Sequence, residues 1–230
     1  AVAVPPDGYF AEIREICDRY EVLFIADEII TGFGRTGRMF AMDHWGVVPD
    51  IIAFGKAASS GYIPLGGVVI SDKIRQVFSD GGEPFAHVFT YVNNPVAMRV
   101  CGTVLDIIAE EGVIEHVVEM GEYLAERAEG FKQYACVGDV RSKGLMMGIE
   151  LVRDKQTKTP FAAEEGMSAR GMSLALARGL HISGVPGVAD LVRGDDLRFY
   201  PPLVITREQL GETLDIIDEV LGELTREAGL

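Results

Sequence analysis

An aspartate and a lysine each stand directly after a short run of apolar residues. Asp27 follows the residues VLFIA at positions 22–26, and Lys56 follows IIAFG at positions 51–55. Apolar runs of this length between polar residues are typical of buried strands. Two such strands are expected to bring an amine and a carboxylate to one rim of a sheet. A lysine in this place could hold an aldehyde cofactor covalently, and the acid could tune the chemistry of that cofactor.

The same two residues also admit a plainer interpretation. A lysine amine in water is protonated at neutral pH, so a catalytic lysine must be desolvated or stored as an imine. Small and apolar neighbours such as Phe54 and Ala57 fit such a site, but a surface lysine at a strand end fits them too. Asp27 could keep a pyridine nitrogen protonated, or it could cap a helix or pair with Arg35. Both interpretations stay open on the residues alone.

The composition is that of a globular protein without a nucleic-acid surface. Apolar residues make up 48% of the 230 residues, and the formal net charge is -14. Contacts to a phosphate backbone need clustered lysine and arginine, which this acidic chain lacks. No apolar run reaches the roughly 18 residues of a membrane helix. We therefore expect a soluble, cytoplasmic protein that binds neither nucleic acid nor membrane.

Cysteine and histidine give no sign of a metal site. Cys17, Cys101 and Cys136 are far apart and form no CxxC pair, and the four histidines are scattered along the chain. Structural zinc needs closely spaced pairs of such ligands. We expect free thiols and no bound metal.

A glycine-rich segment after Asp27 formally matches a dinucleotide-binding fingerprint. Gly32, Gly34 and Gly37 fit G-x-G-x-x-G, and Asp50 follows at a plausible distance for a ribose-binding acid. In that fingerprint, however, the first glycine comes directly off the strand and the third opens a long helix. Here five residues intervene, and only a short helical piece follows. A structural loop that frames a cofactor is therefore the better interpretation.

The order of predicted elements indicates an α/β part followed by an α+β part. Helices are expected at residues 9–20, 71–78, 95–109 and 113–134, with strands at 22–26, 51–54 and 67–71 between them. Beyond these we expect strands at 144–152, 180–183 and 197–200, and helices at 164–178 and 207–224. The change in pattern predicts two domains, residues 1–108 and 109–230.

Four segments in a fixed order resemble a known family. They are DEIITGFGRTG, PDIIAFGKAASSGYIPLGG, FTYVNNPVA and LRFYPPLVIT. In this order they resemble the class III, or omega, aminotransferases, which use pyridoxal 5'-phosphate. The resemblance covers the whole chain but only about the C-terminal half of a family member. It implies fold type I of the pyridoxal-phosphate-dependent transferases. Residues 1–108 would be the C-terminal part of the large cofactor-binding domain with its mixed, largely parallel sheet, and residues 109–230 the small α+β domain.

The resemblance also implies a role for individual residues. Lys56 matches the lysine that forms the Schiff base and shuttles the proton. Asp27 would pair with the pyridine nitrogen, and Ile29 would pack on one face of the ring. Thr90 would reach the cofactor phosphate of a neighbouring subunit, so the resemblance implies a homodimer or a dimer of dimers. Arg198 matches an arginine that holds a substrate carboxylate, a task for which a guanidinium is well suited.

Two departures from the family pattern bear on function. Ile30 stands where ornithine and 4-aminobutyrate enzymes usually carry glutamine, which favours an omega-amine enzyme that uses pyruvate. The phosphate-binding loop and the aromatic residue on the other ring face would lie in an N-terminal half, and the chain starts without methionine on AVAVPP, as if in mid-fold. We expect transfer of an amino group from an omega-amine or amino acid to an oxo acid. The alternatives are a 2-oxoglutarate enzyme of the ornithine or 4-aminobutyrate type, an aminomutase or decarboxylase, and a non-catalytic fragment.

Overall fold

The computed structural model describes residues 2–82 and 84–230, which form two compact units. The first unit is Pro5–Glu115, and the second is His116–Leu230 together with residues 2–4. The division into domains at residues 108 and 109 stays a prediction. Within the described residues, no helix has the length and apolar character needed to cross a membrane.

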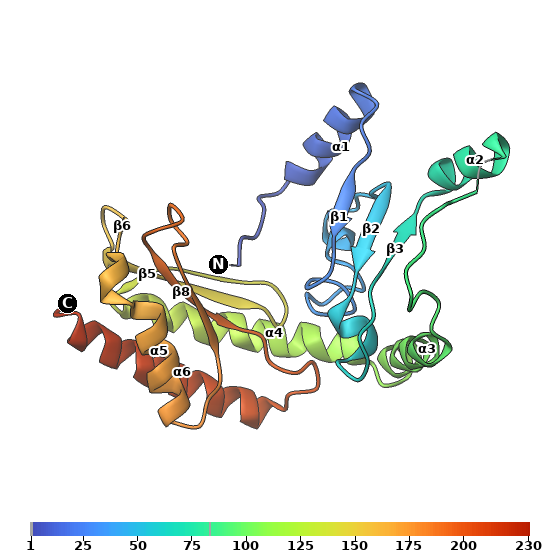
Figure 1. Cartoon of the computed structure of the whole chain (residues 1–230). Helices are drawn as coiled ribbons and strands as arrows, with labels where there is room; N and C mark the ends of the chain where they lie inside the picture. Colours follow the sequence, from blue (N-terminus) through green and yellow to red (C-terminus); the bar gives the residue numbers. More distant parts are fainter. Residues whose placement is uncertain (1, 83) are drawn as a thin grey trace. The chain divides into compact units, whose positions relative to one another are not determined.

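The first unit is built on a three-stranded sheet in the order β1-β2-β3 (Figure 1). Strands β1 and β2 run parallel, and β2 and β3 run antiparallel. The elements of this unit are α1 (Tyr9–Arg19), β1 (Ile25–Asp27), the 3₁₀ helix η1 (Ala41–His44), β2 (Ile51–Phe54), the 3₁₀ helix η2 (Lys56–Ser59), β3 (Gly67–Ile70), α2 (Asp72–Gly81) and α3 (Pro95–Glu110).

A small cluster of apolar side chains holds α1 against the start of β1. Phe24, Ala26 and Met42 are buried, and Phe10 and Ile13 of α1 pack against them. Burial alternates from Phe24 through residue 28, as expected for a strand with one covered face. The strand begins at residue 25 rather than 22. Just before it, the Phe24 carbonyl accepts from the backbone N–H of Asp50, and the Phe24 N–H donates to the Asp50 carboxylate, at 2.8 Å each.

The second unit is a four-stranded antiparallel sheet in the order β4-β5-β8-β7, to which β6 adds at β5. Helices α4, α5 and α6 lie on one side of this sheet (Figure 1). The elements are α4 (Val113–Glu129), which starts within the first unit, the 3₁₀ helix η3 (Gly130–Gln133), β4 (Val137–Ser142), β5 (Met147–Asp154), β6 (Thr159–Pro160), the 3₁₀ helix η4 (Ala163–Glu165), α5 (Met167–Ala177), β7 (Ser183–Pro186), β8 (Asp195–Phe199) and α6 (Arg207–Glu227).

Period-matched apolar residues form the core of the second unit. In α6, Leu210, Leu214, Ile217 and Leu221 recur at spacings of three and four and are buried. Strand β4 was not predicted, because its sequence VGDVRS mixes valine with charged residues. Its charged side chains lie on the face of the sheet away from the core. The mixed sheet of the first unit and the helix-backed antiparallel sheet of the second confirm the predicted fold class.

Candidate active site

The structure brings the ends of β1 and β2 to one edge of the first sheet. Asp27 is the last residue of β1 and pairs with Ala53 in the parallel register of β2. Lys56 comes two residues after the end of β2. Because parallel strands end on the same side, the carboxylate and the amine leave the sheet at one edge. The sequence-based expectation of an acid and a lysine on one rim is therefore met in the fold.

The carboxylate of Asp27 is held by its own turn. Its Oδ1 atom accepts a hydrogen bond from the backbone N–H of Ile29 at 3.0 Å. The other oxygen makes no hydrogen bond to a described residue, and the side chain is exposed. One oxygen thus fixes the carboxylate, and the other remains available to a ligand that donates a hydrogen bond.

Ile29 lies beside Gly55, the residue that precedes Lys56. A Cβ atom added to Gly55 would lie 3.7 Å from Cγ2 of Ile29, so the isoleucine side chain is next to the backbone that leads into Lys56. Lys56 has a φ of 43°, in the left-handed region that side chains other than glycine rarely adopt. Its exposed amine makes no ion pair with any residue in the described ranges. Strain of this kind is often found at functional positions.

Glu28 is a residue that the sequence analysis missed. Its side chain is 2% exposed, on the strand face opposite Asp27. Oε1 accepts from the Met42 backbone N–H at 2.9 Å, and Oε2 accepts from the hydroxyl of Thr31. The carboxylate therefore ties the turn after β1 to η1. The alternation of faces along a strand was the available signal, because it places Asp27 and its neighbour on opposite sides.

The glycine-rich segment is a loop that packs on this turn. A Cβ atom at Gly32 would lie 2.8 Å from the Glu28 carbonyl oxygen, so a larger residue there would force the turn to move. Gly34 and Gly37 have φ values of 90° and 85°. The loop leads into the single turn of η1 rather than into a long helix. This geometry agrees with a framing loop and not with a dinucleotide-binding fingerprint.

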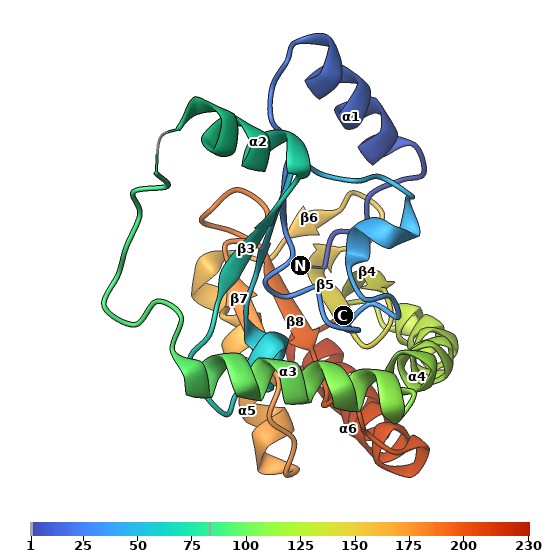
Figure 2. The same ribbon diagram turned by 90° about the vertical axis from the view of Figure 1, so that its right-hand side faces the viewer.

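Thr90 lies in a separate turn of the first unit. The turn is closed by a hydrogen bond from the Val92 N–H to the Phe89 carbonyl at 3.0 Å, and the Thr90 side chain is exposed. Asn94 then caps α3, which packs against η2 (Figure 2). Among the described residues, the Thr90 hydroxyl makes no hydrogen bond. The structure therefore does not join Thr90 to the edge that carries Asp27 and Lys56.

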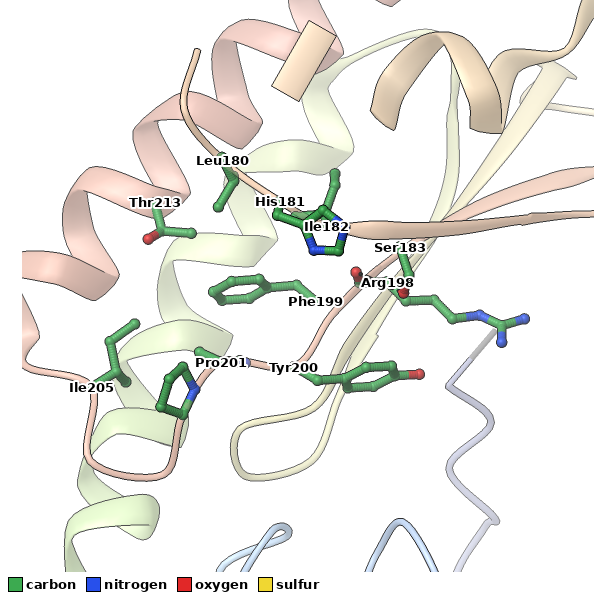
Figure 3. Close-up of a pocket in the computed structure, with 11 residues that line it drawn as sticks. Leu180, His181, Ile182, Ser183, Arg198, Phe199, Tyr200, Pro201, Ile205 and Thr213 are labelled. Atoms are coloured by element: carbon green, nitrogen blue, oxygen red, sulfur yellow. Dashed lines mark hydrogen bonds between the residues drawn. The ribbon is translucent and has the colours of Figure 1, made fainter. Parts of the chain in front are cut away.

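Arg198 belongs to the second unit, where it lies in β8. Its side chain and that of Tyr200 extend to the same side of the strand, away from Phe199 (Figure 3). Its Nε atom donates to Oδ2 of Asp196 at 2.8 Å. The residue also borders a pocket of about 350 Å³ whose walls include Leu180, Phe199 and Thr213. The guanidinium itself lies at the margin of this pocket, beyond the apolar part.

The residues at the edge of the first sheet fit pyridoxal 5'-phosphate. A free amine suits its aldehyde, and a carboxylate with one available oxygen suits its pyridine nitrogen. The segment after Lys56 is made of small residues, of which Ala58 and Ser59 are buried, so the backbone can approach a flat ring closely. The donor set therefore agrees with the cofactor that the resemblance implies.

Comparison with known proteins defines the family. Residues 1–221 match the family model described as aminotransferase class-III, and the chain belongs to this family. It is 39% identical over 223 residues to the putrescine–pyruvate aminotransferase of Pseudomonas aeruginosa, covering 96% of this chain and 47% of the relative. It is 34% identical over 223 residues to gamma-aminobutyrate transaminase 1 of Oryza sativa subsp. indica, covering 96% and 42%.

Solved structures give the same result for the fold. A transaminase from the marine bacterium Virgibacillus superposes with a TM-score of 0.92 at 36% identity, covering 98% of this chain and 51% of that one. The taurine:2-oxoglutarate aminotransferase of Bifidobacterium kashiwanohense, solved with pyridoxal phosphate and glutamate, gives 0.89 at 33% identity, covering 98% and 49%. The chain thus spans about half the length of the relatives it matches.

Proposed function

We propose that the intact protein transfers an amino group from an omega-amine or amino acid to an oxo acid, with pyruvate as the favoured acceptor. The observation that carries this proposal is the pair of Asp27 and Lys56 at the ends of neighbouring parallel strands. Family membership supports it, because relatives named as transaminases share the fold along almost all of this chain.

In this proposal Lys56 has two tasks. Its Nζ atom would hold pyridoxal 5'-phosphate covalently through the aldehyde carbon. Once a substrate has taken that place, the free amine of Lys56 would accept the proton from the substrate Cα. When bound, the cofactor supplies an electron sink for the charge left on that carbon. The exposed position of Lys56 at the sheet edge leaves its amine free to swing between these tasks.

The other residues would hold and orient the cofactor and the substrate. Asp27, whose second oxygen is available, would accept a hydrogen bond from the pyridine nitrogen and keep it protonated, and Ile29 would pack on the ring. Arg198 binds a substrate carboxylate through its guanidinium. Thr90 would contact the cofactor phosphate of a neighbouring subunit, so the intact enzyme would be a homodimer or a dimer of dimers. We also propose that it is cytoplasmic.

The identity of the oxo acid that accepts the amino group has a specific alternative. Ile30 in place of glutamine favours pyruvate, and the name of the Pseudomonas relative agrees. The names of the Bifidobacterium and Oryza relatives favour instead a 2-oxoglutarate or 4-aminobutyrate type. Formation of alanine or of glutamate from a common donor, measured by chromatography, separates the two. Glutamate as the sole product would replace the pyruvate assignment.

A borohydride-trapping experiment tests the covalent site. The intact protein is incubated with pyridoxal phosphate, reduced with borohydride and digested. The masses of the peptides are then measured by mass spectrometry. We expect the cofactor mass on the peptide that contains Lys56, no adduct in Lys56→Ala, and an unchanged adduct in Lys73→Ala, which removes another exposed lysine of the same unit. An adduct that persists in Lys56→Ala would refute the assignment.

The alternative of a non-catalytic fragment concerns the 230-residue chain alone. Because the chain spans about half of its relatives, we propose that the isolated chain transfers amino groups poorly. Adding pyridoxal phosphate to the isolated chain should give little product compared with the intact protein. Equal turnover by both would contradict this expectation.

A further inference from the structure

The second sheet carries two cross-strand rows of mostly polar residues on one face. Residues directly opposite one another on paired strands share a face. The first row runs through Asp139, Glu150, Asp196 and Val185 of β4, β5, β8 and β7. The second row contains Arg141, Gly148, Arg198 and Ser183. Each row thus lies across all four strands, and both arginines are in the same row.

The two arginines of this row have different partners. The Arg141 guanidinium donates from Nε to the Val2 carbonyl at 2.7 Å, and from Nη1 to Asp139 at 2.6 Å and to Glu150 at 2.9 Å. These bonds fix the arginine as part of the sheet. Arg198, in contrast, donates only from Nε among the described residues, so both of its terminal nitrogens remain available to a ligand.

Asp196 fixes the end of Arg198 that is nearest the strand. Its side chain is fully buried, with 0% exposure, although it is charged. Oδ2 accepts from Arg198 Nε at 2.8 Å, and Oδ1 accepts from the Val185 backbone N–H of the neighbouring strand at 3.0 Å. A carboxylate held at both oxygens cannot rotate, so the guanidinium plane that bonds to it is held as well.

We propose that Asp196 is a positioning residue for carboxylate recognition. By occupying Nε of Arg198, it leaves Nη1 and Nη2 as the fork that receives the substrate carboxylate end-on. The inference rests on the proposed function, in which Arg198 binds that carboxylate. In addition, Asp196 sets the direction from which a substrate carboxylate approaches Arg198. The same residue thereby contributes to the preference for substrates that carry a carboxylate.

The charge of Asp196 and its geometry would act in opposite directions on binding. Its negative charge weakens the attraction between Arg198 and an anion, so loss of the charge alone would strengthen binding. Its hydrogen bond orders a long side chain that otherwise loses rotamer freedom when it binds. The side chain of Arg198 is 26% exposed, where solvent screens charge, so we expect the ordering to dominate.

Binding of pyruvate to variants of the intact protein tests this inference. Isothermal titration calorimetry should show that Asp196→Asn raises the Kd for pyruvate about tenfold, the usual cost of a lost hydrogen bond to a charged group. Asp195→Asn is the matched control, because Asp195 is also buried in β8 but accepts from the Ser168 N–H at 2.8 Å. It should lower the melting temperature and leave pyruvate affinity within about twofold.

A double-mutant cycle separates positioning from a general structural role. In an Arg198→Met background, Asp196→Asn should cause no further loss of pyruvate affinity. An equal loss of affinity with and without Arg198, or an unchanged or lower Kd in Asp196→Asn, would overturn the inference. Failure of the wild type to bind pyruvate would overturn it too.

A measurement on the wild-type protein remains decisive should Asp196→Asn not fold. The Nε–H of Arg198, labelled with ¹⁵N and assigned with Arg198→Lys, should exchange with water much more slowly than that of free arginine. Exchange as fast as in free arginine would refute the fixed geometry. If pyruvate binds and Nε–H is protected but no amino transfer occurs, the proposed function fails while the role of Asp196 stands.

Discussion

The two compact units of this chain differ in what their polar and apolar residues do. Among the described residues, the twelve largest fully buried side chains all lie in the second unit. In the first unit, Val68 and Val69 of the sheet are 60% and 52% exposed. The sheet of the second unit pairs Arg141 with Glu150 and Arg198 with Asp196, whereas the first presents Asp27 and Lys56 at an open edge.

This difference separates stability from chemistry along the sequence. A helix-backed sheet with a dense core can order a guanidinium or a carboxylate through fixed hydrogen bonds. An edge with exposed groups offers them to a ligand instead. Substitutions in the apolar core of the second unit should therefore act mainly on stability, and substitutions at the edge of the first mainly on activity.

The largest effect on stability is expected at the core of the second unit. Leu214 is fully buried in α6, and Leu214→Ala should lower the free energy of unfolding by about 2–5 kcal/mol, because it removes apolar contacts and leaves a cavity. Chemical denaturation of the intact protein measures the change. Leu176→Ala in α5, where the leucine is 62% exposed, is the control and should change it by less than about 0.5 kcal/mol. Equal losses would mean that the core is not where the structure places it.

Asp27 should show the opposite behaviour. Asp27→Asn should lower the rate of amino transfer about ten- to a hundredfold, because a charge-assisted hydrogen bond to the cofactor nitrogen is lost. Its melting temperature should stay close to that of the wild type, because asparagine can still accept from the Ile29 N–H. Steady-state kinetics and thermal unfolding measure the two effects.

The neighbouring acid provides the contrast for Asp27. Glu28→Gln should lower the melting temperature, because a buried amide cannot accept from both the Met42 N–H and the Thr31 hydroxyl. A stability loss in Asp27→Asn as large as that in Glu28→Gln would break the separation of roles between the two strand faces.

Backbone strain at Lys56 should give a smaller effect. Both Lys56→Gly and Lys56→Ala remove the amine, but glycine tolerates the φ of 43° without steric cost. The left-handed conformation costs a residue with a Cβ atom about 1–2 kcal/mol, and glycine avoids this cost. Part of the advantage is offset by the greater freedom of glycine in the unfolded chain. We expect Lys56→Gly to be roughly 0.5–1 kcal/mol more stable than Lys56→Ala by chemical denaturation.

A nearby position serves as the control for this comparison. Ala57 follows Lys56 in η2 and does not have a positive φ. Ala57→Gly should therefore destabilise the protein by roughly 0.5–1 kcal/mol. If glycine were destabilising at both positions, the strain at Lys56 would not be real.

The sequence was informative where function depends on the ends of strands. The positions of Asp27 and Lys56 after apolar runs sufficed to predict one shared edge, because strand direction alone determines it. Family motifs added Ile29, which the fold places beside Gly55. The contact of Thr90 with a neighbouring subunit stays a prediction, because it depends on a second chain.

The role of Asp196 could not be predicted in the same way. The spacing of Asp196 and Arg198 puts both on one strand face, but their strand was expected only from residue 197. The second partner of the carboxylate is the Val185 N–H, which becomes adjacent only through the register of β7 on β8. The spacing of residues within one strand carries no information about its register on another strand. The sequence also placed β7 three residues earlier than it occurs.

The smallest effect is expected at alkaline pH, from a tyrosine of the second unit. Burial and a hydrogen bond to Asp218 raise the pKa of Tyr134 from 10.0 to about 12. The folded state therefore keeps a proton that the unfolded state loses, and the resulting stability is fully present below pH 10 and lost as pH rises toward about 12. Thermal unfolding of wild type and Tyr134→Phe should show a constant difference from pH 8 to 9.5 and a narrowing difference above pH 10. A constant difference throughout would mean that the phenol is open to solvent, and this polar group of the second unit would then resemble those at the edge of the first.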